Sequence, residues 1–181
     1  MLDKIQRLDD LVVKKIARIH TPFLNRIMVL FTKLGNGAFI WWITLCFPFL
    51  LMKNFRETGV FLTLALGVNF VLGEIIIKHT IGRMRPSQKL EKEELIIKSP
   101  KDYSFPSGHT ASSFCTFAVT LFRCPPIIFI PVLFVALIIS FSRMYLRVHY
   151  LSDVLGGVVL GLTSGTVCSI LFDIWMSHLF V

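Results

Sequence analysis

Charged residues are scarce in this chain, in which Asp, Glu, Lys and Arg together make up 17% of the 181 residues. A soluble domain carries roughly 25% charged residues, so the chain has too little polar surface for a soluble globular protein. Hydrophobic residues make up 54% and the mean hydropathy is +0.70, which also excludes a disordered, collagen-like or coiled-coil chain. The composition predicts an integral membrane protein.

Cysteine is also rare, and no two of the four cysteines have the CxxC spacing of a zinc or redox site. Each cysteine lies in or beside an apolar run, so we expect small apolar side chains of a membrane interior. A signal peptide is not expected either, because Asp3, Lys4, Arg7 and Asp9 interrupt the stretch where its apolar region would begin. Targeting is therefore expected to rest on internal membrane spans.

Acidic residues are outnumbered, with 11 Asp and Glu against 19 Lys and Arg, for a formal net charge of +8. In so apolar a chain, an excess of basic residues points to anionic lipid headgroups before nucleic acid. We therefore expect the membrane as a partner and no nucleic acid.

Apolar segments recur along the chain; several are shorter than the roughly 20 residues of a membrane-spanning helix, but each can extend through its polar flanks. They predict an all-α fold, a polytopic membrane bundle of about six helices, as a single domain over residues 1–181. The segments are 23–34, 38–52, 59–77, 110–122, 126–141 and 151–175. In the last one, Gly157, Gly161 and Gly165 recur at a spacing of four, which predicts close packing against a neighbouring helix.

The N-terminal residues have a different pattern. Over residues 2–19, apolar side chains recur every three to four positions with basic residues mostly between them. This predicts an amphipathic interfacial helix within residues 1–21, ahead of a transmembrane bundle over residues 22–181. The short helix 23–34 is expected to end at Gly35-Asn36-Gly37 and is too short to cross a bilayer unaided.

The segment 82–105 is the one long polar stretch, and a loop of this length in a compact membrane protein is usually functional. Counting the predicted spans brings polar residues from three separate stretches to the membrane face of this loop. These residues are Lys78, Arg85, Ser107, His109, Arg143, His149 and Asp153. Because ionisable residues in a membrane are costly, their convergence predicts a functional site.

The first stretch carries two cations. If the helix 59–77 continues, Lys78 and Arg85 lie on one face two turns apart until Pro86 interrupts the helix, and two fixed cations suit a phosphate. The alternative is a pair of basic residues snorkelling at a helix end. Glu74, one turn before Lys78, is expected to pair with it.

The second stretch, Pro106-Ser107-Gly108-His109, precedes an apolar helix. Ser107 as N-cap, with the free backbone N–H groups from Gly108 onward, predicts an anion site at the positive end of the helix dipole. A helix cap alone would account for Ser107 and Gly108. It would not account for the titratable His109 at the mouth of this site.

In the third stretch, His149 and Asp153 are four residues apart at the start of the last helix. A carboxylate at this spacing can bind one imidazole nitrogen and leave the other free as a nucleophile. The alternative is metal binding. No second ligand lies at a fixed spacing from His149, and the nearby cations would repel a metal ion, so we expect no metal.

Together, K-x6-RP at 78–86, PSGH at 106–109 and SR-x5-H-x3-D at 142–153 resemble the three-part signature of the type 2 phosphatidic acid phosphatase (PAP2) superfamily. Every signature position is filled, in order, and the resemblance covers residues 35–175. The composition is similar to the integral-membrane lipid phosphatases of the family, and the small size to its bacterial members.

The resemblance implies that His149 attacks phosphorus and forms a phosphohistidine, while Asp153 orients it. It implies His109 as general acid and base. The implied phosphate-binding residues are Lys78, Arg85, Ser107, Gly108 and Arg143. No metal or other cofactor is implied. Arg83 and Arg147 lie beside the signature and are expected at a second phosphate, whereas His20, His79 and His178 are expected to be ordinary interface residues.

The expected function is hydrolysis of a phosphomonoester or pyrophosphate of a membrane lipid, with the alkyl tail entering between helices. Candidate substrates are undecaprenyl pyrophosphate, phosphatidylglycerophosphate and phosphatidate. Two alternatives stay open: a lipid phosphotransferase on the same fold, and a catalytically silent membrane binding or scaffold protein. A transporter is disfavoured, because the charged groups gather at one interface and not at the midplane.

The orientation in the membrane is predicted from two arguments. The first is the distribution of basic residues, which favours the face opposite the site as cytoplasmic. The basic residues expected there are those of the N-terminal helix, Lys53, Arg56 and Arg123, although the loop 82–105 is basic too. The resemblance to bacterial relatives also favours an active site on the extracytoplasmic face of the cell membrane.

Overall fold

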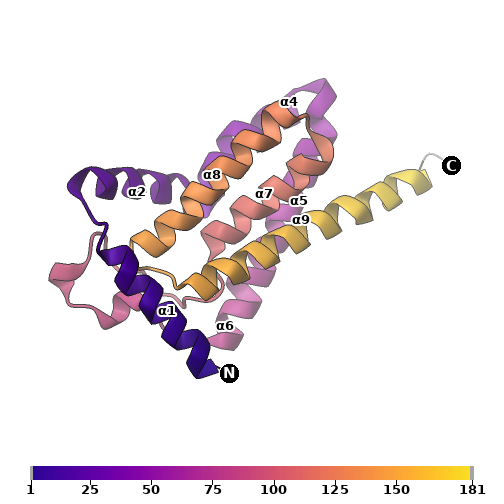
Figure 1. Cartoon of the computed structure of the whole chain (residues 1–181). Coiled ribbons are helices and arrows are strands. Elements are labelled where there is room, and N and C mark those ends of the chain that lie inside the picture. The colour runs from indigo at the N-terminus through magenta and orange to yellow at the C-terminus, as the bar shows by residue number, and fades with distance from the viewer. Residues whose placement is uncertain (1, 180–181) are drawn as a thin grey trace.

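The computed structural model describes residues 2–179, and this part of the chain is all-helical, with no strand (Figure 1). Three helical segments are long and apolar enough to cross a membrane, and a bent helix pair makes a fourth if it counts as one span. The predicted all-α membrane bundle is confirmed. The number of spans is lower than the number of helices, because several helices are short or broken.

The bounds of the elements follow the apolar segments closely. The main helices are α1 (Leu2–Ala17), α2 (Pro22–Leu34), α5 (Arg56–Phe70), α7 (Gly108–Arg123), α8 (Pro126–Tyr145) and α9 (Leu151–Leu179). The shorter ones between α2 and α5 are η1 (Asn36–Ala38), α3 (Phe39–Trp41), η2 (Trp42–Cys46), α4 (Phe47–Leu51) and η3 (Lys53–Phe55). Beyond α5 lie η4 (Val71–Ile77), α6 (Lys78–Ile81), η5 (Pro86–Lys89) and η6 (Lys92–Glu94).

Helix α2 ends where the sequence predicts, at Gly35. The chain then turns through Gly37, whose φ of 55° is readily adopted by glycine, so that α2 and the segment Asn36–Leu51 meet at an angle of 58°. Gly35 itself lies against His109, since a Cβ at Gly35 would come within 2.8 Å of the imidazole Cδ2. The absence of a side chain at Gly35 therefore allows this turn to pack directly against His109.

Helix α7 is the centre of the bundle, and most of its residues are buried although many are Ser and Thr. Their hydroxyls bond to carbonyls of the preceding turn, as Thr116 does to Ser112 at 3.0 Å and Thr120 to Thr116 at 2.9 Å. The hydroxyls are therefore satisfied within the helix, and small side chains let neighbouring helices approach. Cys46 and Cys115 are free and fully buried, as expected of interior cysteines.

The glycine stripe of α9 packs on α7, as the sequence predicts. A Cβ at Gly157 would lie 2.7 Å from the Ser107 carbonyl oxygen, and one at Gly161 only 2.3 Å from that of Ala111. The two backbones are therefore too close for any larger residue. This contact fixes the start of α9 against the start of α7, where the polar residues gather.

The amphipathic helix α1 forms as predicted, with Leu8, Leu11 and the Lys and Arg side chains exposed. Its predicted place, on the face opposite the site, is wrong. Helix α1 lies beside the start of α9 and the end of α8, at the same end of the bundle as the site (Figure 1). The physical reason is the buried carboxylate of Asp9, which bonds to Ser152 and Arg83 at that end.

Candidate active site

A cavity of about 570 Å³ opens at this end of the bundle, between the α2–η1 turn, the α5–α6 segment, α7 and the end of α8. Of the predicted site residues, the ones that line it are Lys78, Arg85, Gly108, His109, Arg143 and His149. The other two, Ser107 and Asp153, are fully buried and are not among the lining residues. The convergence predicted from helix order is therefore present in the fold.

Lys78 and Arg85 reach the cavity by a different local structure from the one predicted. The helix does not continue to Pro86: α6 ends at Ile81, with Gly82 as a left-handed C-cap at a φ of 63°. Arg85 therefore lies on an extended segment after the helix. The helix before it widens into the π-helical segment η4, a feature often found at functional sites, and η4 places Glu74 2.7 Å from the Lys78 ammonium.

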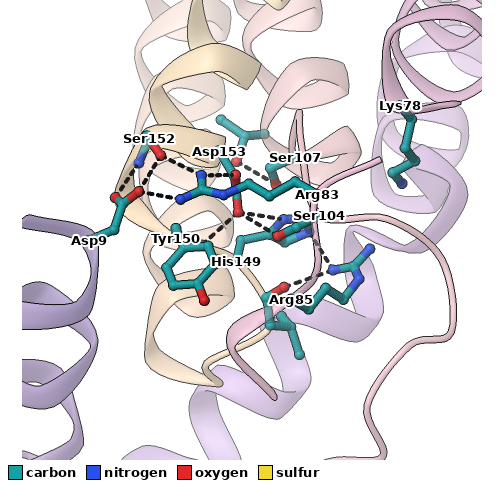
Figure 2. A network of polar contacts seen from close by, with 12 residues as sticks. Asp9, Lys78, Arg83, Arg85, Ser104, Ser107, His149, Tyr150, Ser152 and Asp153 are labelled. Carbon is teal, nitrogen blue, oxygen red and sulfur yellow. Dashed lines mark hydrogen bonds and ion pairs between the residues drawn. The ribbon is translucent and has the colours of Figure 1, made fainter. Parts of the chain in front are cut away.

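The imidazole of His149 is held in one tautomer by Arg85. Nη1 of Arg85 lies 2.8 Å from Nε2 of His149 and 2.8 Å from the carbonyl oxygen of Val148 (Figure 2). A guanidinium can only donate, so Nε2 must accept through its lone pair and the neutral ring carries its proton on Nδ1. The nitrogen with the free electron pair is therefore Nε2.

Asp153 lies on the other side of this ring. Its Oδ2 is 3.7 Å from Nδ1 of His149, beyond hydrogen-bonding distance, and Nδ1 has no hydrogen-bond partner among the described residues. Oδ2 instead accepts from Ser104 Oγ at 2.5 Å and from the backbone N–H of Tyr150 at 2.8 Å. Asp153, the third residue of α9, thus caps the helix by binding the Tyr150 N–H, and the same carboxylate faces the imidazole of His149.

His109 is fixed from the α2–η1 turn. Its Nε2 lies 3.1 Å from the carbonyl oxygen of Thr32 and 2.9 Å from Oδ1 of Asn36. A carbonyl oxygen only accepts, so Nε2 carries a proton. Thr32 and Asn36 are functional candidates that the sequence reasoning missed; the only local signal is that Asn36 lies in the Gly-Asn-Gly turn.

Arg143 is buried at the end of α8, and its Nη1 donates to Thr32 Oγ1. Its Nε is buried and has no hydrogen-bond partner among the described residues. A buried donor without a partner costs free energy, which an anion in the cavity would recover. Arg143 Nε is therefore a buried donor that an anion in the cavity could satisfy.

Ser107 is the N-cap of α7, but its side chain makes no capping bond; Oγ accepts from Thr110 Oγ1 at 3.1 Å. Gly108 carries the more important feature, since a Cβ there would lie 2.1 Å from Oε1 of Glu74. A side chain at this position would displace the Glu74 carboxylate from its place at the helix N-terminus. The predicted anion site at the start of α7 thus has the Glu74 carboxylate beside it.

Asp102, which the sequence reasoning missed, lies between the two cations. Its Oδ2 is 2.7 Å from Nζ of Lys78 and 2.9 Å from Nη2 of Arg85. The bonds to Lys78 and the charge of Arg85 outweigh partial burial and lower the pKa of Asp102 to about 2. No motif in the sequence marks this residue in the polar loop.

The charge around His149 favours the neutral imidazole. Burial, followed by the positive charges of Arg85, Arg143 and Lys78, lowers the pKa of His149 well below its ordinary value of 6.5. His149 is therefore unprotonated at neutral pH, as a nucleophile must be.

The cavity is also lined by Trp42, Leu66, Gly67 and Phe70, which form its apolar wall, together with the polar Asn69. Phe70 is exposed on the outside of the bundle, where lipid would lie. The lining therefore combines cations with this apolar passage, a composition that suits an anionic headgroup with an alkyl tail.

The family model of the PAP2 superfamily matches residues 58–176. The chain belongs to the PAP2 superfamily.

Its relatives in this family are phosphatases. It is 35% identical to an undecaprenyl-diphosphatase of Sulfolobus acidocaldarius over 139 residues, 76% of this chain and 66% of that protein. It is 29% identical to phosphatidylglycerophosphatase B of Bacillus subtilis over 87% of this chain and 80% of that protein. The fold is similar to the crystal structure of a transmembrane PAP2-type phosphatidylglycerolphosphate phosphatase from Bacillus subtilis, with a TM-score of 0.79. The two sequences are 25% identical, and the match covers 94% of this chain and 87% of that one.

The PAP2 signature residues lie together, but the two neighbouring arginines do not join them. Arg83 points to the opposite side of Asp153, with bonds to Asp9 and Asp153, and does not line the cavity (Figure 2). Arg147, at a φ of 55°, donates to the carbonyl of Glu94 and does not line it either. The expected contact of these arginines with a second phosphate in this cavity is therefore wrong, because carboxylate and carbonyl acceptors outside the cavity hold them.

The other histidines lie outside the cavity. His20 bonds to the carbonyl of Tyr145, and His79 to that of Ile75. His178 lies in a part of α9 whose side chains are outside the described set. Among the described residues, no group of three His, Cys, Asp or Glu side chains is arranged to hold a metal ion.

Proposed function

We propose that the protein is a membrane lipid phosphatase that acts through a phosphohistidine on His149. The observation that carries this proposal is the Nε2 lone pair of His149, held by Arg85 at a cavity that Lys78 and Arg143 also line. The family membership supports the reaction class, and the apolar wall of the cavity supports a lipid as substrate.

In the first half of the proposed reaction, Nε2 attacks phosphorus in line with the leaving group. The P–O bond to the lipid breaks as the N–P bond forms, and protonated His109 gives its proton to the leaving oxygen. Lys78, Arg85 and Arg143 stabilise the charge on the transferring phosphoryl group. The positive charge that develops on the His149 ring faces the carboxylate of Asp153.

In the second half, neutral His109 takes a proton from water while the water oxygen attacks phosphorus. The N–P bond breaks, and its electron pair returns to Nε2 of His149. Inorganic phosphate and the lipid alcohol, or the lipid monophosphate from a pyrophosphate, are the products. The residues alone balance this sequence, and the cations lie where a metal ion would otherwise be needed.

The relatives and the apolar lining of the cavity support a choice of lipid substrate. We propose undecaprenyl pyrophosphate or phosphatidylglycerophosphate as substrate, with phosphatidate as the third candidate, because the two relatives above act on lipids of the first two kinds by name. In each case the tail would leave the cavity past Leu66 and Phe70.

The experiment that tests this function measures phosphate release by the detergent-purified protein in excess EDTA. The panel is undecaprenyl pyrophosphate, phosphatidylglycerophosphate and phosphatidate, with His149→Ala as the control. Release that persists in EDTA and is lost in His149→Ala supports the proposal, and the order of rates names the lipid. Transfer to an acceptor lipid without phosphate release would identify a phosphotransferase, and the absence of both reactions in folded protein would contradict an enzyme.

We propose the extracytoplasmic face of the cell membrane for the site, on the family resemblance alone. The charge argument now opposes it, because the basic helix α1 lies at the site end and not at the far end. A single cysteine at exposed Lys98, in a variant without the native cysteines, tests the orientation. Labelling of intact cells by a membrane-impermeant maleimide is the expected result, and labelling only after lysis would overturn it.

A further inference from the structure

Asp9 is a buried acidic residue on a helix that otherwise exposes its charges. Its side chain is 2% accessible, although α1 is an interfacial helix with exposed Lys and Arg residues. A carboxylate is buried at such a position only when it is well paired. The signature of the family does not include residue 9, and the reaction proposed above does not use it.

The partners of Asp9 lead to the site. Oδ2 of Asp9 accepts from Nη2 of Arg83 at 2.6 Å and from Oγ of Ser152 at 2.5 Å, and Oδ1 accepts from the Ser152 backbone N–H at 3.0 Å (Figure 2). Nη1 of Arg83 in turn donates to Oδ1 of Asp153 at 2.7 Å and to Ser152 Oγ at 2.6 Å. One guanidinium thus bridges the carboxylate of α1 and the carboxylate that faces the proposed nucleophile.

The position of Arg83 is fixed from three sides. Its guanidinium carbon lies 4.2 Å from the centre of the Tyr150 ring, and Nη2 also donates to Gln6 of α1 at 2.8 Å. Both acceptors of Nη2 come from α1, so this helix holds one side of the guanidinium. Arg83 holds Oδ1 of Asp153, while Ser104 and the Tyr150 N–H hold Oδ2.

The charge of Arg83 is shared between two carboxylates. If Asp9 were neutral, Arg83 would act on Asp153 alone and would offset more of its negative charge. Asp153 would then stabilise the positive charge that develops on His149 less well. The substrate cations Lys78, Arg85 and Arg143 are not part of this network and would be unaffected.

We propose that Asp9 is a positioning residue of the reaction, which acts on His149 through Arg83 and Asp153. This inference rests on the proposed function. It gives the interfacial helix α1 a part in catalysis. The helix supplies Asp9, the second carboxylate that binds Arg83, so that the charge of Arg83 is shared between Asp9 and Asp153. The alternative is a purely structural role, in which Asp9 only attaches α1 to the start of α9.

The test is a double-mutant cycle between Asp9→Asn and Asp153→Asn, with kcat and KM measured on the best lipid substrate. Asp9→Asn is expected to lower kcat about tenfold, the scale of outer-shell contacts, while KM changes less than about twofold. In the Asp153→Asn background the same change is expected to alter kcat less than about twofold, because the residue through which it acts is gone.

Asp3→Asn is the matched control, since it removes the same charge from an exposed position of the same helix. It is expected to keep the kcat of the wild type. Two results would overturn the inference and leave the proposed function intact. One is a wild-type kcat in Asp9→Asn; the other is a tenfold loss of kcat from Asp9→Asn in the Asp153→Asn background as well. A wild-type protein without phosphatase activity would overturn both.

Ser152→Ala keeps the test decisive if Asp9→Asn does not fold. This variant retains both carboxylates and Arg83 but removes the hydroxyl that contacts Asp9 and Arg83. We expect a fall in kcat of about threefold that vanishes in the Asp153→Asn background. The same fall in both backgrounds would mean a structural role for the network and would overturn the inference.

Discussion

Nη1 of Arg85 and Nε2 of His149 lie 2.8 Å apart, and this contact assigns the tautomer of the proposed nucleophile. The donor is a guanidinium that does not lose its proton, so the lone pair of His149 is on Nε2 in the neutral ring. The same guanidinium bonds to Asp102 through Nε and Nη2. Arg85 therefore links the nucleophile, the phosphate-binding cations and the polar loop.

Replacing Arg85 by Lys tests this arrangement. A lysine keeps the positive charge but cannot donate at once to His149, Val148 and Asp102, as the planar guanidinium does. We expect Arg85→Lys to lower kcat/KM about 100-fold, the scale of one lost transition-state donor. Lys89→Arg, outside the cavity, serves as the control and is expected to keep wild-type kinetics. Retention of kcat/KM in Arg85→Lys would show that charge alone is sufficient.

Asp102 pairs with two of the cations that the proposed reaction assigns to phosphate. Its carboxylate lies within 2.9 Å of both Lys78 and Arg85, and its side chain is about half exposed. Removing one charge at this distance in a water-like environment is worth about 1 kcal/mol. We therefore expect Asp102→Asn to lower the inhibition constant of inorganic phosphate about fivefold.

Asp173→Asn is the control for this change, because Asp173 pairs with Arg123 at the far end of the bundle. Phosphate inhibition of Asp173→Asn is expected to match the wild type. Weaker inhibition by phosphate in Asp102→Asn would mean that Asp102 orders the cations for the phosphate and does not compete with it.

Gly67 gives access to the apolar passage. It lines the cavity, and a Cβ at this position would meet no heavy atom within 4 Å. We expect Gly67→Leu to fill the passage and raise KM for a long-chain lipid phosphate about tenfold, while hydrolysis of a short, soluble phosphomonoester is unchanged. Val68→Leu, on the exposed side of the same helix, is the control. An equal effect of Gly67→Leu on both substrates would place the tail elsewhere.

The lowered pKa of His149 has a consequence for stability. Below the ordinary value of 6.5, the unfolded chain binds a proton at this residue that the folded protein does not, so stability is present above pH 6.5 and is lost as pH falls below it. Asp102, with a pKa of about 2, contributes in the same direction only at lower pH, below its ordinary value of 3.8.

Thermal unfolding of the wild type and of His149→Gln at about pH 7.5 and 5.5 isolates this contribution. The wild type is expected to lose more thermal stability between the two pH values than His149→Gln does. Equal losses would mean that His149 titrates near its ordinary pKa in the folded protein. The other histidines are present in both proteins and do not affect the comparison.

The sequence was sufficient to predict that Lys78, Arg143 and His149 meet at one end of the bundle, because helix order brings them there. It was also sufficient for the glycine stripe of α9, whose spacing of four is local. The end of α6 was mispredicted, since the left-handed cap at Gly82 stops the helix before Arg85. A glycine within a basic stretch was the available signal.

Residues paired over long separations were out of reach of the sequence. Asp9 meets Arg83 and Ser152 across the whole chain, and Asp102 meets Lys78 from an irregular loop, so no periodicity or spacing marks either. The side on which α1 lies is set by the Asp9 contacts, by the bond from Arg83 to Gln6 and by packing of Ile16 on the cluster that contains Tyr145. Such contacts become visible only once the bundle has brought the segments together.

The most direct test of the central claim, covalent attack by His149, is the stereochemical course at phosphorus. A phosphomonoester substrate made chiral with the three isotopes of oxygen is given to the wild-type protein together with an alcohol that replaces water as the acceptor, and the configuration at phosphorus is determined in the new ester. Two in-line displacements, first by Nε2 and then by the acceptor oxygen, each invert phosphorus, so net retention is the expected result. Net inversion would mean a single displacement by the acceptor and would contradict a phosphohistidine intermediate.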